Sequence, residues 1–158
     1  MHERREPGHS HRGESLEGER ARTPISAAAA LDFYRNILGA EELFRMDDNG
    51  RVGHAEIRIG GRVLMLADEH PEMGSAGPSP DGASAVSLML YVDDADDVIQ
   101  RAVAAGATLA REASDQFYGD RMGGIVDPFG HRWHIATHIE DIAPDEMERR
   151  MNELHGKD

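Results

Sequence analysis

Two segments of this chain carry the same pattern of caps, helices and strands. Ser26 and Asp93, which lie 67 residues apart, are candidate helix caps, and Gly39 and Gly106, at the same offset, follow the ends of the two helices. In each segment an amphipathic helix precedes three strand patterns. A unit of this size that occurs twice predicts a fold of two similar modules in the α+β class.

The first module is predicted to hold one helix and three antiparallel strands. Apolar residues recur at helical spacing over residues 27–38, and tight-turn signals at Asn49-Gly50 and Gly60-Gly61 separate alternating strand patterns. The strands are expected at residues 43–46, 52–59 and 63–67.

The second module is predicted to begin with an additional strand at residues 86–92. A helix capped by Asp93 or Asp94 follows, and three strands are expected at residues 108–111, 120–126 and 131–137. At the same offset, the counterpart of the additional strand would be residues 19–25. Pro24 cannot donate to a strand ladder, so the first strand of module one is expected to be degenerate or missing.

Composition changes along the chain mark its expected organisation. Residues 1–24 are charged and nearly devoid of large apolar side chains, which predicts a disordered tail. One domain is expected over residues 25–140, with module one at 25–68, a loop rich in Pro and Gly at 69–84, and module two at 85–138. Residues 141–158 are predicted to be a C-terminal helix and tail, with Met147, Met151 and Leu154 at helical spacing.

The overall composition excludes several classes of protein. Thirty acidic and 17 basic residues give a net charge of −13, which disfavours a nucleic-acid partner. There is no cysteine, so disulfides, Cys-ligated zinc and thiol nucleophiles are excluded. No apolar run approaches the length of a membrane span, and the N-terminus lacks the apolar block of a signal peptide. We therefore expect a cytoplasmic protein without a membrane partner.

Alternation along the strands separates two faces. Leu64, Leu88, Leu90 and Ile135 lie on an aliphatic face that suits the two helices. The other face combines Met, Ser, Tyr and His, including Met65, Ser87, Met89, Tyr91 and His134. Such a mixture is typical of a ligand pocket with a few polar groups on an apolar lining, and the alternative is a polar sheet face open to solvent.

Two groups of polar residues are candidates for chemistry. His54, Glu56, His134 and His138 are possible metal ligands if their strands are neighbours, and otherwise they are surface or hydrogen-bonded residues. Tyr118, Asp120 and Arg121 follow a loop, where Arg121 would either bind a carboxylate or phosphate of a ligand or pair with an aspartate of this chain. The segment Asp127-Pro128-Phe129-Gly130 is interpreted as a structural turn.

Several motifs resemble the vicinal oxygen chelate superfamily, which includes glyoxalase I, bleomycin-resistance proteins and extradiol dioxygenases. The resemblance runs over residues 26–151 and rests on the paired modules, on Leu31-Asp-Phe-Tyr-Arg-Asn-Ile-Leu-Gly39 and on Asp127-Pro-Phe-Gly-His-Arg-Trp133. A narrower resemblance to its PhnB-like branch rests on residues 53–60, 64–69, 115–121 and 136–141, which read GHAEIRIG, LMLADE, DQFYGDR and ATHIED.

The resemblance implies two βαβββ modules that form a U-shaped mixed sheet around a pocket, usually in a homodimer. In metal-dependent members, four metal ligands face that pocket. The equivalent strand positions of three of these ligands hold Met65, Ser87 and His134 in this chain. The fourth would fall within residues 19–25. Only His134 retains ligand chemistry, so the resemblance implies a protein without the full metal quartet. The cofactor is left unassigned.

The resulting hypothesis is a homodimer that binds a small molecule, without a catalytic residue being assigned. A role like that of bleomycin-resistance proteins would suit the acidic surface, which attracts cationic compounds. The alternative is a metal-dependent lyase, isomerase or dioxygenase acting on a substrate with vicinal oxygens. The predicted ligand-binding residues come from both modules: Met65, Ser87, Met89, Phe117, Tyr118, Arg121 and His134.

Overall fold

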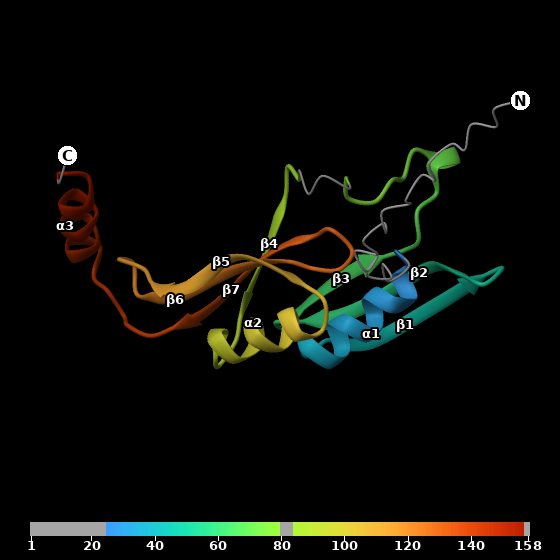
Figure 1. Ribbon diagram of the computed structural model, residues 1–158, viewed down its shortest axis with the longest axis horizontal. Helices are drawn as coiled ribbons and strands as arrows, with labels where there is room; N and C mark the ends of the chain where they lie inside the picture. Colours follow the sequence, from blue (N-terminus) through green and yellow to red (C-terminus); the bar gives the residue numbers. More distant parts are fainter. Residues whose placement is uncertain (1–24, 80–83, 157–158) are drawn as a thin grey trace, which may run out of the picture.

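The computed structural model describes residues 25–79 and 84–156, and it confirms an α+β fold built from two modules. Within these residues the chain forms three α-helices and seven strands in two sheets (Figure 1). The predicted tail at 1–24 lies outside the described residues, as does nearly all of the degenerate strand predicted at 19–25.

Module one forms a three-stranded antiparallel sheet, here called sheet one, in the order β1-β2-β3. Helix α1 (Ala27–Ile37) precedes β1 (Glu41–Asp48), β2 (Arg51–Ile59) and β3 (Arg62–Leu66). Ser26 caps α1 by accepting a 3.2 Å hydrogen bond from the Ala29 amide. Asn49 and Gly50, at the β1–β2 turn, have φ angles of +49° and +81°, which a two-residue hairpin turn of this hand requires. Among the described residues, no strand pairs with the outer edge of β3.

Module two forms a four-stranded mixed sheet, sheet two, in the order β4-β7-β6-β5. Its elements are β4 (Ser87–Tyr91), α2 (Ala95–Ala104), β5 (Thr108–Asp115), β6 (Asp120–Val126) and β7 (Arg132–His138). Strand β4 runs parallel to β7, and the other pairs are antiparallel. Asp94 caps α2 through the Asp97 amide, which decides between the two predicted caps. A short 3-10 helix, Pro71–Met73, interrupts the loop between the modules.

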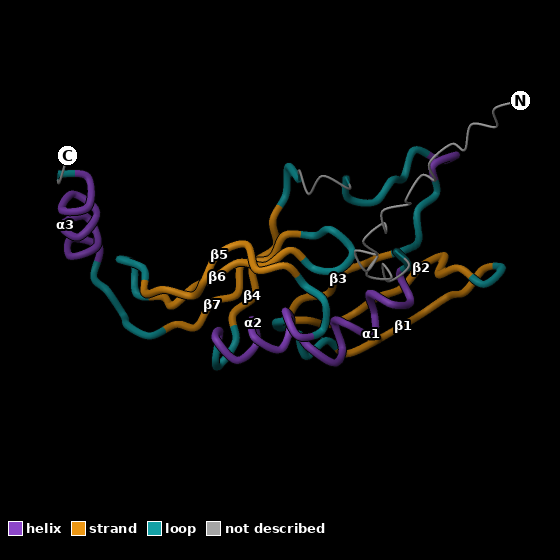
Figure 2. The backbone as a smooth tube through the Cα atoms, in the orientation of Figure 1, coloured by secondary structure: helices purple, strands orange, loops and turns teal. Residues whose placement is uncertain are grey.

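Each sheet buries its aliphatic face against a helix. Ile57 and Ile59 of β2 belong to the core that includes α1, and Ile125 and Ile135 belong to the part of the core beside α2. The two helices also contact each other, and Figure 2 shows the sheets extending away from this helix pair in opposite directions. Among the helices of the described residues, α1 packs on sheet one and α2 on sheet two, which leaves the opposite face of each sheet without a described helix over it.

Asp127 connects the two modules, in agreement with the structural turn predicted at 127–130. One carboxylate oxygen, Oδ1, accepts hydrogen bonds from the amides of Phe129 and His131 at 3.0 and 2.9 Å. The other, Oδ2, accepts from the Tyr34 hydroxyl at 2.7 Å and from the Trp133 indole at 2.9 Å. Four donors compensate for the burial of this carboxylate, which otherwise would be costly.

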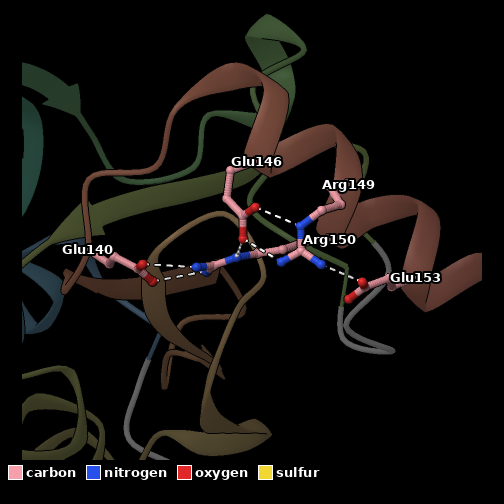
Figure 3. A network of polar contacts seen from close by, with 5 residues as sticks. All are labelled: Glu140, Glu146, Arg149, Arg150 and Glu153. Carbon is pink, nitrogen blue, oxygen red and sulfur yellow. Dashed lines mark hydrogen bonds and ion pairs between the residues drawn. The ribbon is translucent and has the colours of Figure 1, made fainter.

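Helix α3 (Pro144–His155) confirms the predicted C-terminal helix and stands apart from both sheets (Figure 1). None of its residues is buried. The amides of Ile139 and Glu140 donate to the Gly119 carbonyl at 2.9 and 3.0 Å, which fixes the segment that leads into the helix. Arg150 pairs with Glu140 through two 2.9 Å hydrogen bonds and also bonds Glu146 (Figure 3).

Candidate functional site

The open face of sheet two carries several polar side chains that could contact a ligand. On β7, Trp133 and Ile135 point into the core, so His134 and His138 point to the opposite face. On β6, the position of Gly123 faces Ile99 of α2, so Gly124 faces away from the helix. Strand alternation thus places His134 and Gly124 together on the open face.

Strand register aligns four residues in one row across this face. Arg111 of β5 is opposite Gly124 of β6, Gly124 is opposite His134 of β7, and His134 is opposite Met89 of β4. Gly124 contributes no side chain, so a gap remains between Arg111 and His134. Glycine within a strand often marks a place where a ligand comes close to the backbone.

The gap is part of a cavity of about 290 Å³, here called the His134 hollow. This volume is close to the lower end of the range for small-molecule pockets, about 300 Å³. Among the residues that the structure describes, no aspartate or glutamate lines it. Its lining comes from β4 and the residues before it, β5, β6 and β7: Ser84, Ala85, Val86, Ser87, Ala110, Arg111, Gly124, Ile125, Arg132, Trp133 and His134.

His134 has a buried polar atom that is not satisfied. Its Nδ1 is shielded from solvent and has no hydrogen-bond partner, and it is the one such side-chain atom found among the described residues. Buried polar groups in folded proteins nearly always have a partner, because an unpaired one costs about 1–3 kcal/mol. Because His134 lines the hollow, this ring nitrogen becomes a candidate contact for a ligand if the ring turns toward the hollow.

The seven residues predicted to bind a ligand are distributed over several places. Ser87 and His134 line the His134 hollow, and Met89 is beside His134 on the same face. Met65 lies on the open face of sheet one, where it is 68% exposed. Phe117 and Tyr118 lie in the β5–β6 turn, where their rings meet edge to face at 5.2 Å and Phe117 borders a groove beside α3.

Arg121 lies on the helix side of β6, on the face opposite Gly124. It donates two hydrogen bonds to Asp96 of α2, at 2.5 and 2.9 Å, and one to Asp115 at 2.9 Å. These hydrogen bonds raise the pKa of the Arg121 guanidinium. Arg121 was predicted either to bind a ligand or to pair with an aspartate of this chain, and the structure shows the pairing with aspartates. The lining residues that sequence reasoning did not select include Arg111, Gly124 and Arg132.

A second polar cluster lies at the other end of β7. The carboxylate of buried Asp120 accepts a hydrogen bond from the Tyr91 hydroxyl at 2.7 Å. Its other oxygen is hydrogen-bonded to His138 Nδ1 at 2.9 Å. His138 Nε2 lies 2.8 Å from Asp141, at the start of the connection to α3. The hydrogen bonds to Asp120 and then Asp141 raise the pKa of His138, and the bond to Asp120 raises the pKa of Tyr91.

The possible metal ligands do not converge. His54 Nε2 and Glu56 Oε1 lie 3.2 Å apart on sheet one. His134 and His138 belong to the other sheet, sheet two. In residues 25–79 and 84–156, no group of three or more His, Asp or Glu side chains is arranged to hold a metal ion. The three carried-over positions in the described chain offer a thioether, a hydroxyl and one imidazole, and these three donors alone do not fit a divalent ion. The fourth position falls within residues 19–25, of which only Ile25 is described.

Comparisons with known proteins agree with the architecture. Proteins of Mycobacterium bovis and Mycobacterium tuberculosis, both described as uncharacterized, are 39% identical over 130 residues. The alignment covers 80% of this chain and 86% and 76% of theirs. No helix in the described parts of the chain has both the length and the apolar character needed to cross a membrane.

Solved structures show the same fold. TioX from Micromonospora sp. ML1 is 25% identical with a TM-score of 0.57, covering 73% of this chain and 92% of that one. A gene product of Arabidopsis thaliana is 26% identical with a TM-score of 0.57, and the match covers 70% of this chain and 87% of that one. A PhnB protein from Bacillus cereus, 21% identical with a TM-score of 0.51, covers 70% and 90% and supports the fold alone.

The family assignment follows from the match to a family model. That model describes the Glyoxalase/Bleomycin resistance protein/Dioxygenase superfamily, and it matches residues 24–135, which include both modules. The paired βαβββ pattern, incomplete only at the first strand of module one among the described residues, agrees with that match. The chain belongs to the Glyoxalase/Bleomycin resistance protein/Dioxygenase superfamily.

Proposed function

We propose that this protein binds a small molecule in the His134 hollow, without a full set of metal ligands. The supporting observation is the buried Nδ1 of His134, which has no hydrogen-bond partner in the described chain. A ligand atom that donates to or accepts from this nitrogen would remove the cost of leaving it unpaired. Of the predicted residues, Ser87 lines the same hollow and Met89 is paired with His134 across the neighbouring strand, and Gly124 provides the space.

The other predicted residues have different roles in this proposal. Met65, Phe117 and Tyr118 lie on surfaces away from the hollow, and Arg121 is engaged with Asp96 and Asp115. The motifs at residues 53–60 and 115–121 also lead us to place the chain in the PhnB-like branch.

The test is ligand-detected NMR with a set of small aromatic compounds, comparing wild type with Gly124→Val. A Cβ at Gly124 would meet its neighbours at 3.7–3.8 Å, which is ordinary contact, so valine is expected to fold and to fill the hollow. His155→Ala is a matched control for His134→Ala, because His155 is exposed on α3. Binding that survives both Gly124→Val and His134→Ala would contradict the proposal.

The alternative function, a metal-dependent lyase, isomerase or dioxygenase, is not favoured by a specific arrangement in the described residues. Elemental analysis of purified protein tests it. A stoichiometric ion that is lost in His134→Ala would favour the enzyme. The fourth ligand would then be sought in residues 19–25, nearly all of which lie outside the described chain.

We also propose that the protein functions as a homodimer. A 12-residue helix without tertiary contacts is marginal in water, yet α3 buries none of its residues against its own chain. Sheet one likewise leaves large apolar side chains uncovered on its open face: Phe44, Met46, Val63 and Met65. A second copy would cover such surfaces on both chains at once, which is how twofold assemblies use one patch twice.

A further inference from the structure

The charge of the His134 hollow indicates which class of ligand it would take. We propose that the hollow is selective for an anion, a compact organic molecule with a carboxylate or a similar oxyanion, and that Arg111 contacts the charged group. This inference rests on the proposed binding function of the same hollow. It differs from the cationic ligand expected from the acidity of the whole chain.

The first argument is the sign of the charge in the lining. Arg111 and Arg132 supply two positive charges, and His134 and Ser87 supply groups that can donate hydrogen bonds. Within residues 25–79 and 84–156, no acidic side chain lines the hollow, although the chain has 30 acidic residues and a net charge of −13. Local potential in a cleft follows from the charges that line it, so this hollow would attract anions while most of the surface repels them.

The second argument concerns Arg111 itself. Arg101, Arg121 and Arg150 each form ion pairs with carboxylates of this chain. Arg111 forms no hydrogen bond or ion pair with the described residues, and it extends from an exposed strand into the lining of the hollow. Arg132 adds positive charge to the same wall, although it is engaged in a further contact. A guanidinium without a partner is well suited to bind a carboxylate through two parallel hydrogen bonds.

The third argument is the spacing across the sheet. Arg111 and His134 are separated by one strand, which carries Gly124 between them. Neighbouring strands lie about 4.8 Å apart, so the backbones of β5 and β7 are separated by roughly 10 Å. That span accommodates a carboxylate held from both sides, with the guanidinium on one side and the imidazole on the other.

The state of the imidazole provides a signature for this geometry. A carboxylate oxygen accepts hydrogen bonds and cannot donate one when it is ionised, so His134 would have to carry its proton on Nδ1. Binding of a carboxylate should therefore select the Nδ1–H form of the ring. Ring ¹⁵N chemical shifts report this form directly, independently of affinity.

The experiment uses three probes of nearly the same shape and different charge: benzoate, benzamide and benzamidine. We expect benzoate to bind at least about tenfold more tightly than benzamide, a difference of about 1.4 kcal/mol, and benzamidine to bind most weakly. In Arg111→Gln the affinity for benzoate should fall by roughly tenfold, whereas the affinity for benzamide should change little. Arg62→Gln is the matched control, because Arg62 is exposed on sheet one and does not line the hollow.

The outcomes separate the two proposals. If benzamide binds as tightly as benzoate and Gly124→Val abolishes both, the hollow is a ligand site but the anion inference is wrong. If Arg62→Gln weakens benzoate binding as much as Arg111→Gln, the effect is long-range charge and the inference is again overturned. If no probe binds, or if binding is unchanged in both Gly124→Val and His134→Ala, the proposed function itself fails.

Discussion

The Tyr34 hydroxyl donates a 2.7 Å hydrogen bond to the buried carboxylate of Asp127 and so connects helix α1 of the first module to the β6–β7 turn of the second. Burial, together with the adjacent Asp127 charge, raises the pKa of Tyr34, so the phenol remains a donor over the whole working pH range. The orientation of the two modules depends in part on this contact.

Tyr34→Phe should therefore destabilise the protein by about 1–3 kcal/mol, since it leaves one lone pair of a buried carboxylate without its donor. Urea unfolding measures the change. Tyr118→Phe is the control, because the one hydrogen bond of the Tyr118 hydroxyl within the described residues is to the Met122 sulfur, at 3.7 Å. Equal losses in the two variants would show that the Tyr34–Asp127 bond does not have this role.

Gly119 is required for the approach to α3. Its φ of +94° favours glycine, and a Cβ there would collide with the carbonyl oxygen of Glu140. Gly119→Ala should destabilise the protein by about 1–3 kcal/mol and make residues 139–155 more sensitive to proteolysis. Gly50→Ala is the comparison, because Gly50 has a φ of +81° but no atom within 4 Å of a Cβ. If Gly50→Ala costs as much, the collision with Glu140 is unimportant.

His138 should make stability depend on pH. Its pKa is raised in the folded protein by hydrogen bonds to Asp120 and Asp141, and Tyr91 is the other titratable group at Asp120. Protonated His138 therefore stabilises the folded state. This contribution is complete below the pKa of histidine in the unfolded chain, about 6.5, and it is lost as the pH rises through the pKa of His138 in the folded protein.

The melting temperature of the wild type should accordingly exceed that of His138→Ala by more at pH 5.5 than at pH 9. His155→Ala is the control, because this exposed residue of α3 has no hydrogen bond with the described residues. A difference between wild type and His138→Ala that is constant across this range would contradict the assigned bridge.

Met151 tests the proposed homodimer. It lies on the apolar stripe of α3 with Met147 and Leu154, and it is exposed in the single chain. Met151→Glu should weaken dimerisation by at least about tenfold in sedimentation analysis, because it places a charge where apolar contact is expected. Asn152→Glu, on another side of the helix, should have little effect. A wild-type protein that remains monomeric at high concentration would contradict the homodimer.

Much of the fold could be predicted from local signals in the sequence. Ser26 and the Asn49-Gly50 turn marked boundaries correctly because caps and hairpin turns depend on nearby backbone geometry. Strand alternation also placed His134 on the face opposite Trp133 and Ile135. These features needed no knowledge of which distant residues meet.

The composition of the hollow depended on long-range register. Arg111 is opposite Gly124 only after a register shift between Leu109 and Arg111 in β5, and such bulges have no clear sequence signal. A glycine inside β6 was the one available indication. Likewise, the contact between Asp120 and His138 follows from β6–β7 pairing, which residue spacing along the chain does not specify.

Residue-resolved NMR during a titration with benzoate tests binding in the His134 hollow most directly. We predict saturable shifts centred on His134, Gly124 and Ser87, with the His134 ring adopting its Nδ1–H form, and loss of these shifts in Gly124→Val. Saturable shifts confined to sheet one or α3, or no saturable shifts at all, would contradict the assignment of the hollow as the binding site.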